Sequence, residues 1–376
     1  VGRVDEDAVG RHPGGQRALG RGRELLDDVT DHVGVPHPER ARPRHRAAGV
    51  RAHVAHAVVA GDLDPEAVAT ARGNTISDML HRTAARTPDK VAIIDGDVRL
   101  TYAEFDAAVN RCANALTARG LDRGDRLALI SHNSWQFAVL NFACARIGAI
   151  LVPINFGLGV SEITFILDHS QASGVVVEDA LGPTVIEAIE TAGTPIDIRG
   201  WIPLAETQAP QGFEPVADWM TTGDASAPGV VIDDDEPVRM MYTSGTESRP
   251  KGVLLSSKSL MTQYVSCIVD GGMEGSDVEI HALPMYHCAQ LDCFFSVDVY
   301  LGATSIILHA PDAATMLATI EAERVTKLFC PPTVWISLLR HPDFDTRDLS
   351  SLRKGYYGAA IMPVEVLKEL ARRKPE

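Results

Sequence analysis

The residues with the clearest chemical content lie in one stretch of the chain, residues 240–253, which reads Met-Met-Tyr-Thr-Ser-Gly-Thr-Glu-Ser-Arg-Pro-Lys-Gly-Val. Apolar residues begin and end it, a pattern that predicts a loop between two strands. Glycines let the backbone turn its N–H groups inward, hydroxyls add hydrogen-bond donors, and Lys251 adds a point charge. Because phosphate oxygens accept many hydrogen bonds at once, the stretch predicts a polyphosphate-binding loop.

Two other interpretations of this loop agree less well with its residues than a polyphosphate-binding loop does. A P-loop requires Gly-Lys followed by Ser or Thr. Here Pro250 precedes Lys251 and Gly252 follows it, which excludes a P-loop. A solvated surface turn rich in Gly and Ser is the second interpretation, but such turns rarely combine so many donors with Pro-Lys-Gly.

The order Tyr-Thr-Ser-Gly-Thr followed by Pro-Lys-Gly resembles the phosphate-binding signature of the adenylate-forming, AMP-binding family, which includes acyl-CoA synthetases, luciferases and the adenylation domains of peptide synthetases. The chain departs from the family pattern twice, with Glu247 in place of a hydroxyl and Ser248 in place of a glycine. A carboxylate there repels phosphates unless Arg249, Lys251 or Mg²⁺ compensates for its charge. The resemblance implies a catalytic role for Lys251. It also implies that the following residues bind the phosphates of ATP: Thr243, Ser244, Gly245, Thr246, Lys251 and Gly252.

A second motif, Pro-Met-Tyr-His, ends at His287. Taken alone, a histidine in apolar surroundings is more often a core residue than a catalyst. The motif resembles the family's Pro-x-[Phe/Tyr]-His signature, which implies that His287 is catalytic and lies where the acyl chain and the adenylate meet. Gln290 stands where the family often has glycine, so the resemblance also implies a narrower or reshaped acyl tunnel.

A third motif lies in residues 352–360, which predict a strand that runs into small residues. Small side chains allow a flat ring to lie against the backbone. The corresponding turn of the family packs on adenine, so the resemblance implies that Gly358, Ala359 and Ala360 bind the base.

The amino-acid composition argues against several classes of function. The 376 residues carry a formal charge of −15, which argues against nucleic acid as a general partner. The six cysteines form no Cys-x-x-Cys pair, so we expect neither a zinc ribbon nor a disulfide framework, but buried free thiols such as Cys144 and Cys330 in a reducing cytoplasm. The most apolar region, residues 137–156, is interrupted by polar side chains, so we expect no membrane span.

Residues 1–73 differ from the rest of the chain. They contain no Lys, Asn, Ile, Met, Phe, Tyr, Ser, Cys or Trp, but eleven Arg and six of the thirteen His. Such a segment buries little apolar surface to offset the entropy of ordering. We predict a low-order extension, translated from GC-rich DNA upstream of the natural start; an Arg/His-rich arm for nucleic acid is the alternative.

Residues 74–376 alternate between strand and helix patterns, which predicts an α/β fold with parallel sheets and helices on both faces. Residues 195–237 are weakly patterned, and the acidic run 233–236 predicts a solvated connector, with a metal site as the alternative. Predicted strands are 91–94, 99–100, 126–131, 149–153, 174–178, 281–287 and 305–308, together with a strand and turn over 327–333 and a strand that runs into small residues over 352–360. Predicted helices are 76–87, 102–119, 135–147, 160–169, 259–269, 313–323, 334–339 and 363–373.

The resemblance extends over residues 74–376 and implies the large N-terminal domain of the adenylate-forming fold, incomplete at its C-terminal end. In the family this domain continues with an aromatic-Gly-x-Thr-Glu loop, a Thr-Gly-Asp motif and a small mobile domain that carries a lysine. The sequence therefore predicts a truncated version of such an enzyme.

The family's chemistry joins a carboxylate to ATP with Mg²⁺, giving acyl-AMP and pyrophosphate, and then transfers the acyl group to the thiol of CoA. The apolar segments 291–295 and 332–339 favour a fatty acid, and hence a fatty-acid–CoA ligase. Amino-acid adenylation would call for an acidic residue that receives an ammonium group, and the sequence indicates none. The sequence also leaves open a non-catalytic remnant and a protein whose unfinished sheet edge pairs with another chain. The oligomeric state is not indicated.

Overall fold

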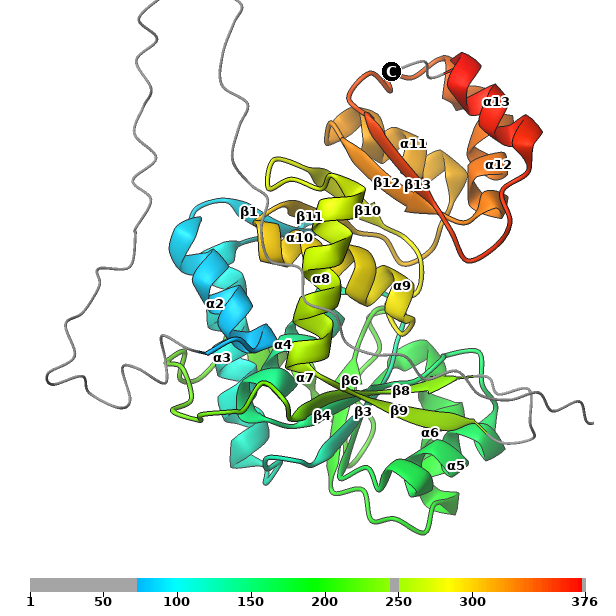
Figure 1. The fold of residues 1–376 in the computed structure, drawn as a ribbon. Coiled ribbons are helices and arrows are strands. Elements are labelled where there is room, and N and C mark those ends of the chain that lie inside the picture. Colours follow the sequence, from blue (N-terminus) through cyan, green and yellow to red (C-terminus); the bar gives the residue numbers. More distant parts are fainter. Residues whose placement is uncertain (1–72, 244–249, 374–376) are drawn as a thin grey trace, which may run out of the picture. The chain divides into compact units, whose positions relative to one another are not determined.

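The structure, a computed structural model, describes residues 73–243 and 250–373 (Figure 1). The predicted extension up to residue 72 and three predicted phosphate-binding residues, Ser244, Gly245 and Thr246, lie outside these ranges. The division of the chain at residue 73 therefore stays a prediction.

Two sheets make up the described part of the chain. One has six strands in the order β13-β12-β10-β11-β1-β2, and the other has seven in the order β7-β6-β5-β3-β4-β8-β9. Neighbouring strands are parallel except at β1–β2 and β8–β9, which are antiparallel. The strands of the first sheet are β1 (Val91–Asp95), β2 (Val98–Thr101), β10 (Val278–His281), β11 (Thr304–Ile307), β12 (Lys327–Cys330) and β13 (Lys354–Tyr357). Those of the second are β3 (Arg126–Ile130), β4 (Ile150–Pro153), β5 (Gly174–Glu178), β6 (Ile198–Ile202), β7 (Glu214–Pro215), β8 (Pro237–Thr243) and β9 (Lys251–Ser256).

Helices connect most of the parallel strands, as the predicted crossovers require. The longer ones are α2 (Ile76–Arg86), α3 (Tyr102–Ala118), α4 (Trp135–Ile147), α5 (Val160–Ser170), α6 (Gly182–Thr191), α8 (Ser257–Gly271), α11 (Ala313–Ala322), α12 (Pro332–Arg340) and α13 (Val364–Arg373). The shorter ones are α7 (Val216–Thr221), α9 (Cys288–Gln290), α10 (Ser296–Leu301), the 3₁₀ turns η1 (Asp179–Leu181) and η3 (Pro342–Asp345), and the π-helical turn η2 (Leu291–Phe295).

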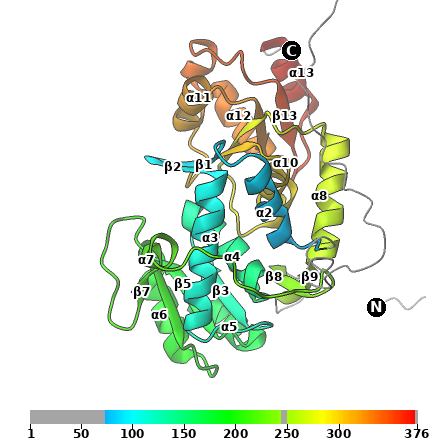
Figure 2. The same cartoon turned by 90° about the vertical axis from the view of Figure 1, so that its left-hand side faces the viewer.

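Both faces of the seven-stranded sheet are covered, so its central strands are apolar at nearly every position. In β3, Leu127 and Leu129 belong to the core formed with α3 and α4, whereas Ala128 and Ile130 belong to the core formed with α5 and α6. Helices α3 and α4 pack against each other on their side of the sheet (Figure 2). The side-chain period of two along a strand sends alternate residues to the two cores. The α/β fold with helices on both faces is thus confirmed.

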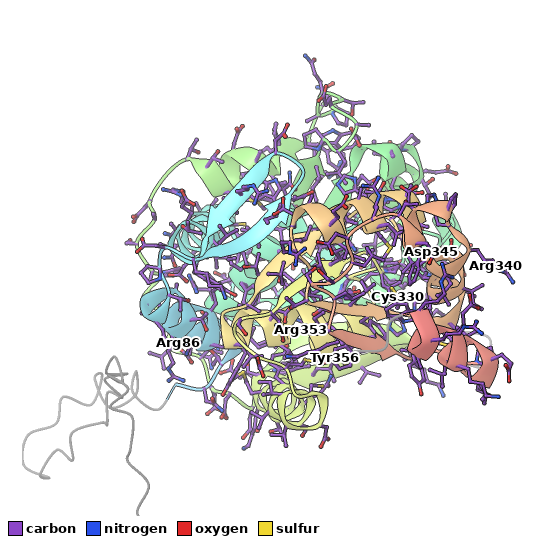
Figure 3. All side chains as sticks on the ribbon, turned by 90° about the horizontal axis from the view of Figure 1, so that it is seen from above. Arg86, Cys330, Arg340, Asp345, Arg353 and Tyr356 are labelled. Carbon is purple, nitrogen blue, oxygen red and sulfur yellow. The ribbon has the colours of Figure 1, made fainter. Side chains whose placement is uncertain are left out.

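One prediction for an individual element is wrong. The strand expected over 281–287 ends at His281, and the motif that carries His287 is a turn beyond the strand. The weakly patterned region 195–237 contains β6 and α7, whose side chains include the buried Trp219. The predicted free thiols are confirmed for Cys144 and Cys330, which are both buried. Figure 3 locates Cys330 and Tyr356 on the neighbouring strands β12 and β13.

Deleting residues 1–73 is expected to leave the melting temperature unchanged within a few degrees, because the segment has too little apolar surface to join a core. A thermal melt of the full chain and of the shortened chain measures this. A fall of more than about 4 °C, equivalent to roughly 1 kcal/mol or more for a chain of this size, would show that the extension contributes to stability.

Candidate active site

The predicted phosphate-binding loop joins β8 to β9, which pair as an antiparallel hairpin. Thr243 lies opposite Lys251 and Tyr242 lies opposite Gly252 in the register of this hairpin. The residues on either side of the loop therefore face each other across two hydrogen-bonded strands. The prediction of a loop between two strands is confirmed.

Gly252 has a packing reason to be glycine. A Cβ atom at this position would lie 3.2 Å from the ring of Tyr242 and 3.2 Å from Met240 Sδ. Contacts this short require the Met240 and Tyr242 side chains to shift by a few tenths of an ångström if position 252 carries a side chain. The glycine thus accommodates these two side chains of β8.

His287 lies on a turn that leaves the carboxyl end of β10, and Asn133 fixes this turn. The Asn133 amide donates to the carbonyl oxygens of His281 at 3.1 Å and Leu283 at 2.8 Å, and its Oδ1 accepts from Met285 N–H at 2.8 Å. Asn133 itself follows β3 of the other sheet. Asn133 was not predicted as a site residue, although a polar side chain shortly after a buried strand was a usable signal.

The tautomer of His287 follows from its contacts. Its Nδ1 accepts a hydrogen bond from the Ala289 N–H at 3.2 Å, as the cap of α9. A neutral imidazole whose Nδ1 is an acceptor carries its proton on Nε2. His287 is exposed, so this Nε2–H group can donate to a ligand oxygen.

A pocket of about 300 Å³ brings the two motifs together. Its wall includes Thr243 and Pro250 from the two sides of the phosphate-binding loop, and His287 from the turn after β10. The other lining residues are Pro153, Asn155, Leu158, Glu162, Ile166, Met241, Tyr242, Tyr286 and Cys288. The structure thus brings the two sides of the predicted loop and His287 to one cavity, whereas Lys251 and Gly252 are not among its lining residues.

The predicted adenine-binding turn follows β13. Strands β10, β12 and β13 are parallel neighbours, so the turn of His287 and the turn at Gly358 leave the sheet at the same edge. A Cβ atom at Gly358 would lie 3.3 Å from the ring of Phe329, and Ala359 has φ +62°, in the left-handed region. The predicted adenine-binding residues do not line the pocket of His287.

Aromatic and charged side chains at the carboxyl ends of β3, β4, β5 and β10 lie near the turn of His287. The ring of His132 stacks on Phe156 at 3.9 Å, and Phe156 meets Tyr286 edge-on at 5.1 Å. His132 Nδ1 contacts the buried Glu178 carboxylate at 2.9 Å. Tyr286 belongs to the predicted Pro-Met-Tyr-His motif, but His132, Phe156 and Glu178 were not singled out from the sequence, because their contacts join segments far apart in the chain.

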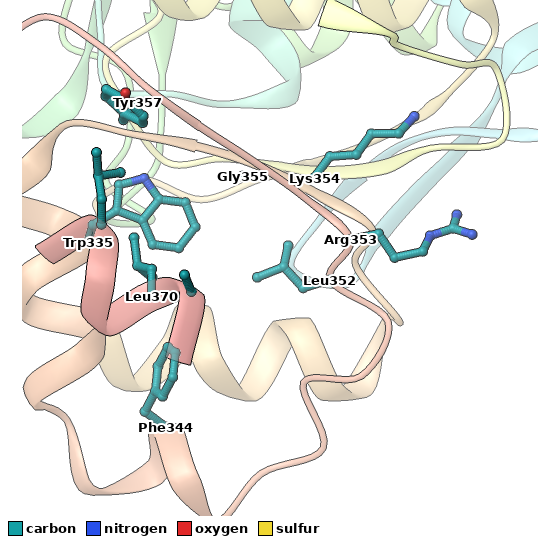
Figure 4. Close-up of a pocket in the computed structure, with 10 residues that line it drawn as sticks. Trp335, Phe344, Leu352, Arg353, Lys354, Gly355, Tyr357 and Leu370 are labelled. Carbon is teal, nitrogen blue, oxygen red and sulfur yellow. The ribbon is translucent and has the colours of Figure 1, made fainter. Parts of the chain in front are cut away.

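A second pocket, of about 200 Å³, lies beside β13 and differs in chemistry (Figure 4). Trp335 lies against this strand and donates its Nε1–H to the Tyr356 carbonyl at 3.0 Å. Most of the other lining side chains are apolar, among them Phe344, Leu352 and Leu370. Arg353 and Lys354 also line the pocket, and Lys354 is paired with Asp277 at 2.9 Å. We assign the predicted phosphate site to the pocket of His287 instead, because Thr243 and Pro250, on the two sides of the predicted loop, line that pocket.

Among residues 73–243 and 250–373, one carboxylate lines the pocket of His287, that of Glu162, which accepts from Gly159 N–H at 3.0 Å. The acidic run at 233–236 includes Asp235, paired with Lys258 at 2.9 Å, and Glu236, paired with Arg123. Asp233, Asp234 and Asp235 of this run also lie close enough together to hold a metal ion, so the connector stays a prediction, with a metal site as its alternative.

A buried cluster of charged residues lies behind the turn of His287. Glu279, His281, Asp298 and Lys327 are all 0 % exposed. The carboxylates and His281 are close enough to hold a metal ion, but the ammonium of Lys327 already contacts Glu279 at 2.8 Å and Asp298. This ammonium supplies the positive charge that the buried carboxylates require, so we assign no metal there.

Burial raises the pKa of the Glu279 carboxyl well above its usual value, against the opposing effect of Lys327. A carboxyl whose pKa is raised on folding stabilises the fold less as the pH rises from its unfolded pKa, about 4.5, to its folded pKa. Glu279→Gln mimics the protonated form. Its stability advantage over the unchanged protein is expected to grow by about 1.4 kcal/mol per pH unit in that range.

Urea unfolding of both proteins at pH 5, 6, 7 and 8 measures this dependence. The His281 side chain is common to both proteins, and its pKa is lowered by burial, so its own contribution cancels in the difference. A constant difference between the two proteins at all four pH values would contradict the raised pKa.

The chain belongs to the family described as AMP-binding enzyme, whose model matches residues 80–376. Its fold matches that of a solved N-terminal domain of FACL13 from Mycobacterium tuberculosis, with a TM-score of 0.72 and 31 % identity over 80 % of this chain and 74 % of that one. The predicted N-terminal domain of the adenylate-forming fold is thus confirmed.

Curated relatives carry different substrate names. A feruloyl-CoA synthase of Amycolatopsis sp is 33 % identical over 285 residues, 76 % of this chain and 54 % of that protein. The long-chain-fatty-acid–CoA ligase FadD13 of Mycobacterium tuberculosis is 33 % identical over 301 residues, 79 % of this chain and 58 % of that protein. The chain therefore spans a little over half the length of these relatives. In its described part, no helix combines the length and hydrophobicity needed to span a bilayer.

Proposed function

We propose that the chain acts in the ATP-dependent activation of a carboxylic acid and its transfer to CoA. The observation that carries the proposal is the single pocket lined by Thr243, Pro250 and His287. It supports a site in which phosphates at the β8–β9 loop and an acyl carboxylate at His287 are held side by side. Names of relatives that include feruloyl-CoA synthase and fatty-acid–CoA ligase agree with this reaction class.

In the first step, a carboxylate oxygen of the acid attacks the α-phosphorus of ATP, the bond to the bridging oxygen breaks, and pyrophosphate leaves. In the second step, the CoA sulfur attacks the acyl carbon, the bond to the AMP oxygen breaks, and the thiol proton is released. Mg²⁺, when bound with ATP, would neutralise phosphate charge. Lys251 would stabilise the departing phosphates electrostatically, and His287 Nε2–H would donate to an oxygen of the carboxylate or adenylate.

The proposed substrate is a fatty or other apolar acid. Apolar side chains such as Leu158, Ile166 and Met241 line the pocket, which agrees with such an acid. The segment Leu291–Phe295, which favoured a fatty acid in the sequence, has Leu291 and Phe295 fully buried in the core instead. An amino acid is the weaker candidate, because the pocket's carboxylate, Glu162, is engaged as a helix cap.

Calorimetric titration of the 376-residue chain tests the proposal. The ligands are ATP with Mg²⁺ and two non-hydrolysable acyl-adenylate analogues, dodecanoyl-sulfamoyl-adenosine and feruloyl-sulfamoyl-adenosine. We expect both analogues to bind more tightly than ATP, since each fills the acyl and nucleotide parts of one site. A soluble, folded protein that binds none of the three would instead support a non-catalytic remnant.

A further inference from the structure

The helical segment directly after His287 buries polar side chains where a helix ordinarily buries apolar ones. Gln290 is 1 % exposed, and Asp292 and Asp298 are 0 % exposed. Burying a charge costs free energy unless the charge is paired and hydrogen-bonded. Together these side chains are bonded to β8, β10, β12 and α8, so the segment is held at several points.

Asp292 is fastened to the other sheet. Its Oδ1 forms an ion pair with the guanidinium of Arg239 and accepts a hydrogen bond from the Tyr264 hydroxyl at 3.0 Å. Arg239 lies in β8, is 1 % exposed, and also donates to Asn141 Oδ1 on α4. The guanidinium is thus held by two acceptors that lie on different elements.

The ion pair of Arg239 and Asp292 lies between the strand that leads to the phosphate-binding loop and the helical segment that follows His287. Arg239 lies in β8, the strand that ends at Thr243 where the phosphate-binding loop begins. Asp292 lies in η2, which follows α9 and its capping residue His287. A single buried contact therefore joins the strand before the loop to the helical segment after the histidine.

The other buried contacts of the segment do not make this connection. Gln290 contacts His281 at 2.6 Å, and Asp298 contacts Lys327. His281 and Lys327 lie in β10 and β12, both strands of the six-stranded sheet, which does not include β8. Of these three side chains, Asp292 is the one bonded to a strand of the seven-stranded sheet.

We propose that Asp292 and Arg239 are positioning residues whose ion pair fixes His287 relative to Thr243 at the end of β8. The inference rests on the proposed function, since it concerns the alignment of acid and nucleotide in that site. Reaction rates and bisubstrate affinities are sensitive to such alignment, because a displacement of about 1 Å can cost about a hundredfold in rate. A buried ion pair contributes little net stability compared with an apolar pair but can select one geometry.

The test uses Asp292→Asn in the full chain, which removes the charge and keeps the shape. Titrations measure the affinities for ATP alone, dodecanoate alone and dodecanoyl-sulfamoyl-adenosine. If the pair aligns two half-sites, the affinity for the analogue falls by about tenfold or more, whereas those for the separate ligands change by less than about twofold. Equal losses for all three ligands, or no loss, would overturn the proposal.

Two further variants separate alignment from general destabilisation. Asp298→Asn breaks a buried ion pair that joins the same segment to Lys327 of the six-stranded sheet. It is expected to lower the melting temperature without changing the affinity for the analogue relative to the affinities for ATP and dodecanoate. The double variant Arg239→Gln/Asp292→Asn replaces the ion pair by a neutral hydrogen-bonded pair. The double variant is expected to regain most of the affinity for the analogue. If Asp292→Asn alone does not fold, the titrations are made with the double variant.

The same titrations distinguish an error in the proposed function from an error in the proposed positioning role. If the unchanged, folded chain binds neither ATP nor the analogue, the proposed function falls and this inference falls with it. If the unchanged chain binds the analogue and Asp292→Asn binds it equally well, only the positioning role is overturned. A double variant that folds but does not recover affinity would also count against that role.

Discussion

Lys327→Met is expected to lower the free energy of unfolding by about 3–5 kcal/mol, the usual cost of leaving a buried charge without its partner. Lys327 is fully buried and contacts two carboxylates, those of Asp298 and Glu279. Its ammonium holds the pKa of Asp298 at about 2, although burial alone would raise it. Without the ammonium, Asp298 must either stay charged in an apolar interior or take up a proton.

Chemical unfolding at pH 7 measures the loss. Lys368→Met is the matched control, because Lys368 is exposed on α13 and forms a surface pair with Glu365. Such pairs contribute about 0–1 kcal/mol, so the control is expected to differ little from the unchanged protein. A loss below about 1 kcal/mol for Lys327→Met would contradict the role assigned to the buried cluster.

Lys251→Ala is expected to weaken ATP binding by about tenfold, the equivalent of roughly 1.4 kcal/mol. AMP binding is expected to change by less than about twofold, because a point charge at the loop acts on phosphates that AMP lacks. We expect this effect because Lys251 lies directly opposite Thr243 in the hairpin, at the point where the loop ends and β9 begins.

Competition binding with a fluorescent ATP analogue measures both affinities. Lys258→Ala is the matched control, since Lys258 lies on α8 shortly after the loop and is paired with Asp235 at 2.9 Å. Removing it tests whether any nearby positive charge would have the same effect. Equal weakening by the two substitutions, or equal weakening of ATP and AMP by Lys251→Ala, would contradict a specific contact with the outer phosphates.

The sequence determined the local structure because the signals involved are local. The helix predicted over 135–147 and the strand predicted over 174–178 have those bounds in the structure. The capping box of Thr101 and Glu104 is present, with both reciprocal hydrogen bonds. The hairpin around the phosphate-binding loop follows from apolar strands that flank turn residues. In each case, side chains a few residues apart decide the conformation.

The region around β6 shows where local signals fail. Gly200 is typical of a loop in sequence, but it lies in the middle of this strand. A Cβ atom there would lie 2.6 Å from Val216 Cγ1 and 2.7 Å from the ring of Trp219. The glycine is needed because α7 packs directly on the strand, and a packing requirement of this kind has no local signature.

The same distinction between local and tertiary information applies to the residues of the candidate site. The motifs at Lys251 and His287 could be found from residue types and their spacing. Their meeting at one pocket, the support of the His287 turn by Asn133, and the ion pair of Arg239 with Asp292 depend on how the two sheets are placed. Arg239 and Asp292 are 53 residues apart in the chain. Only folding pairs such distant charges, because burial is what makes each of them require a partner.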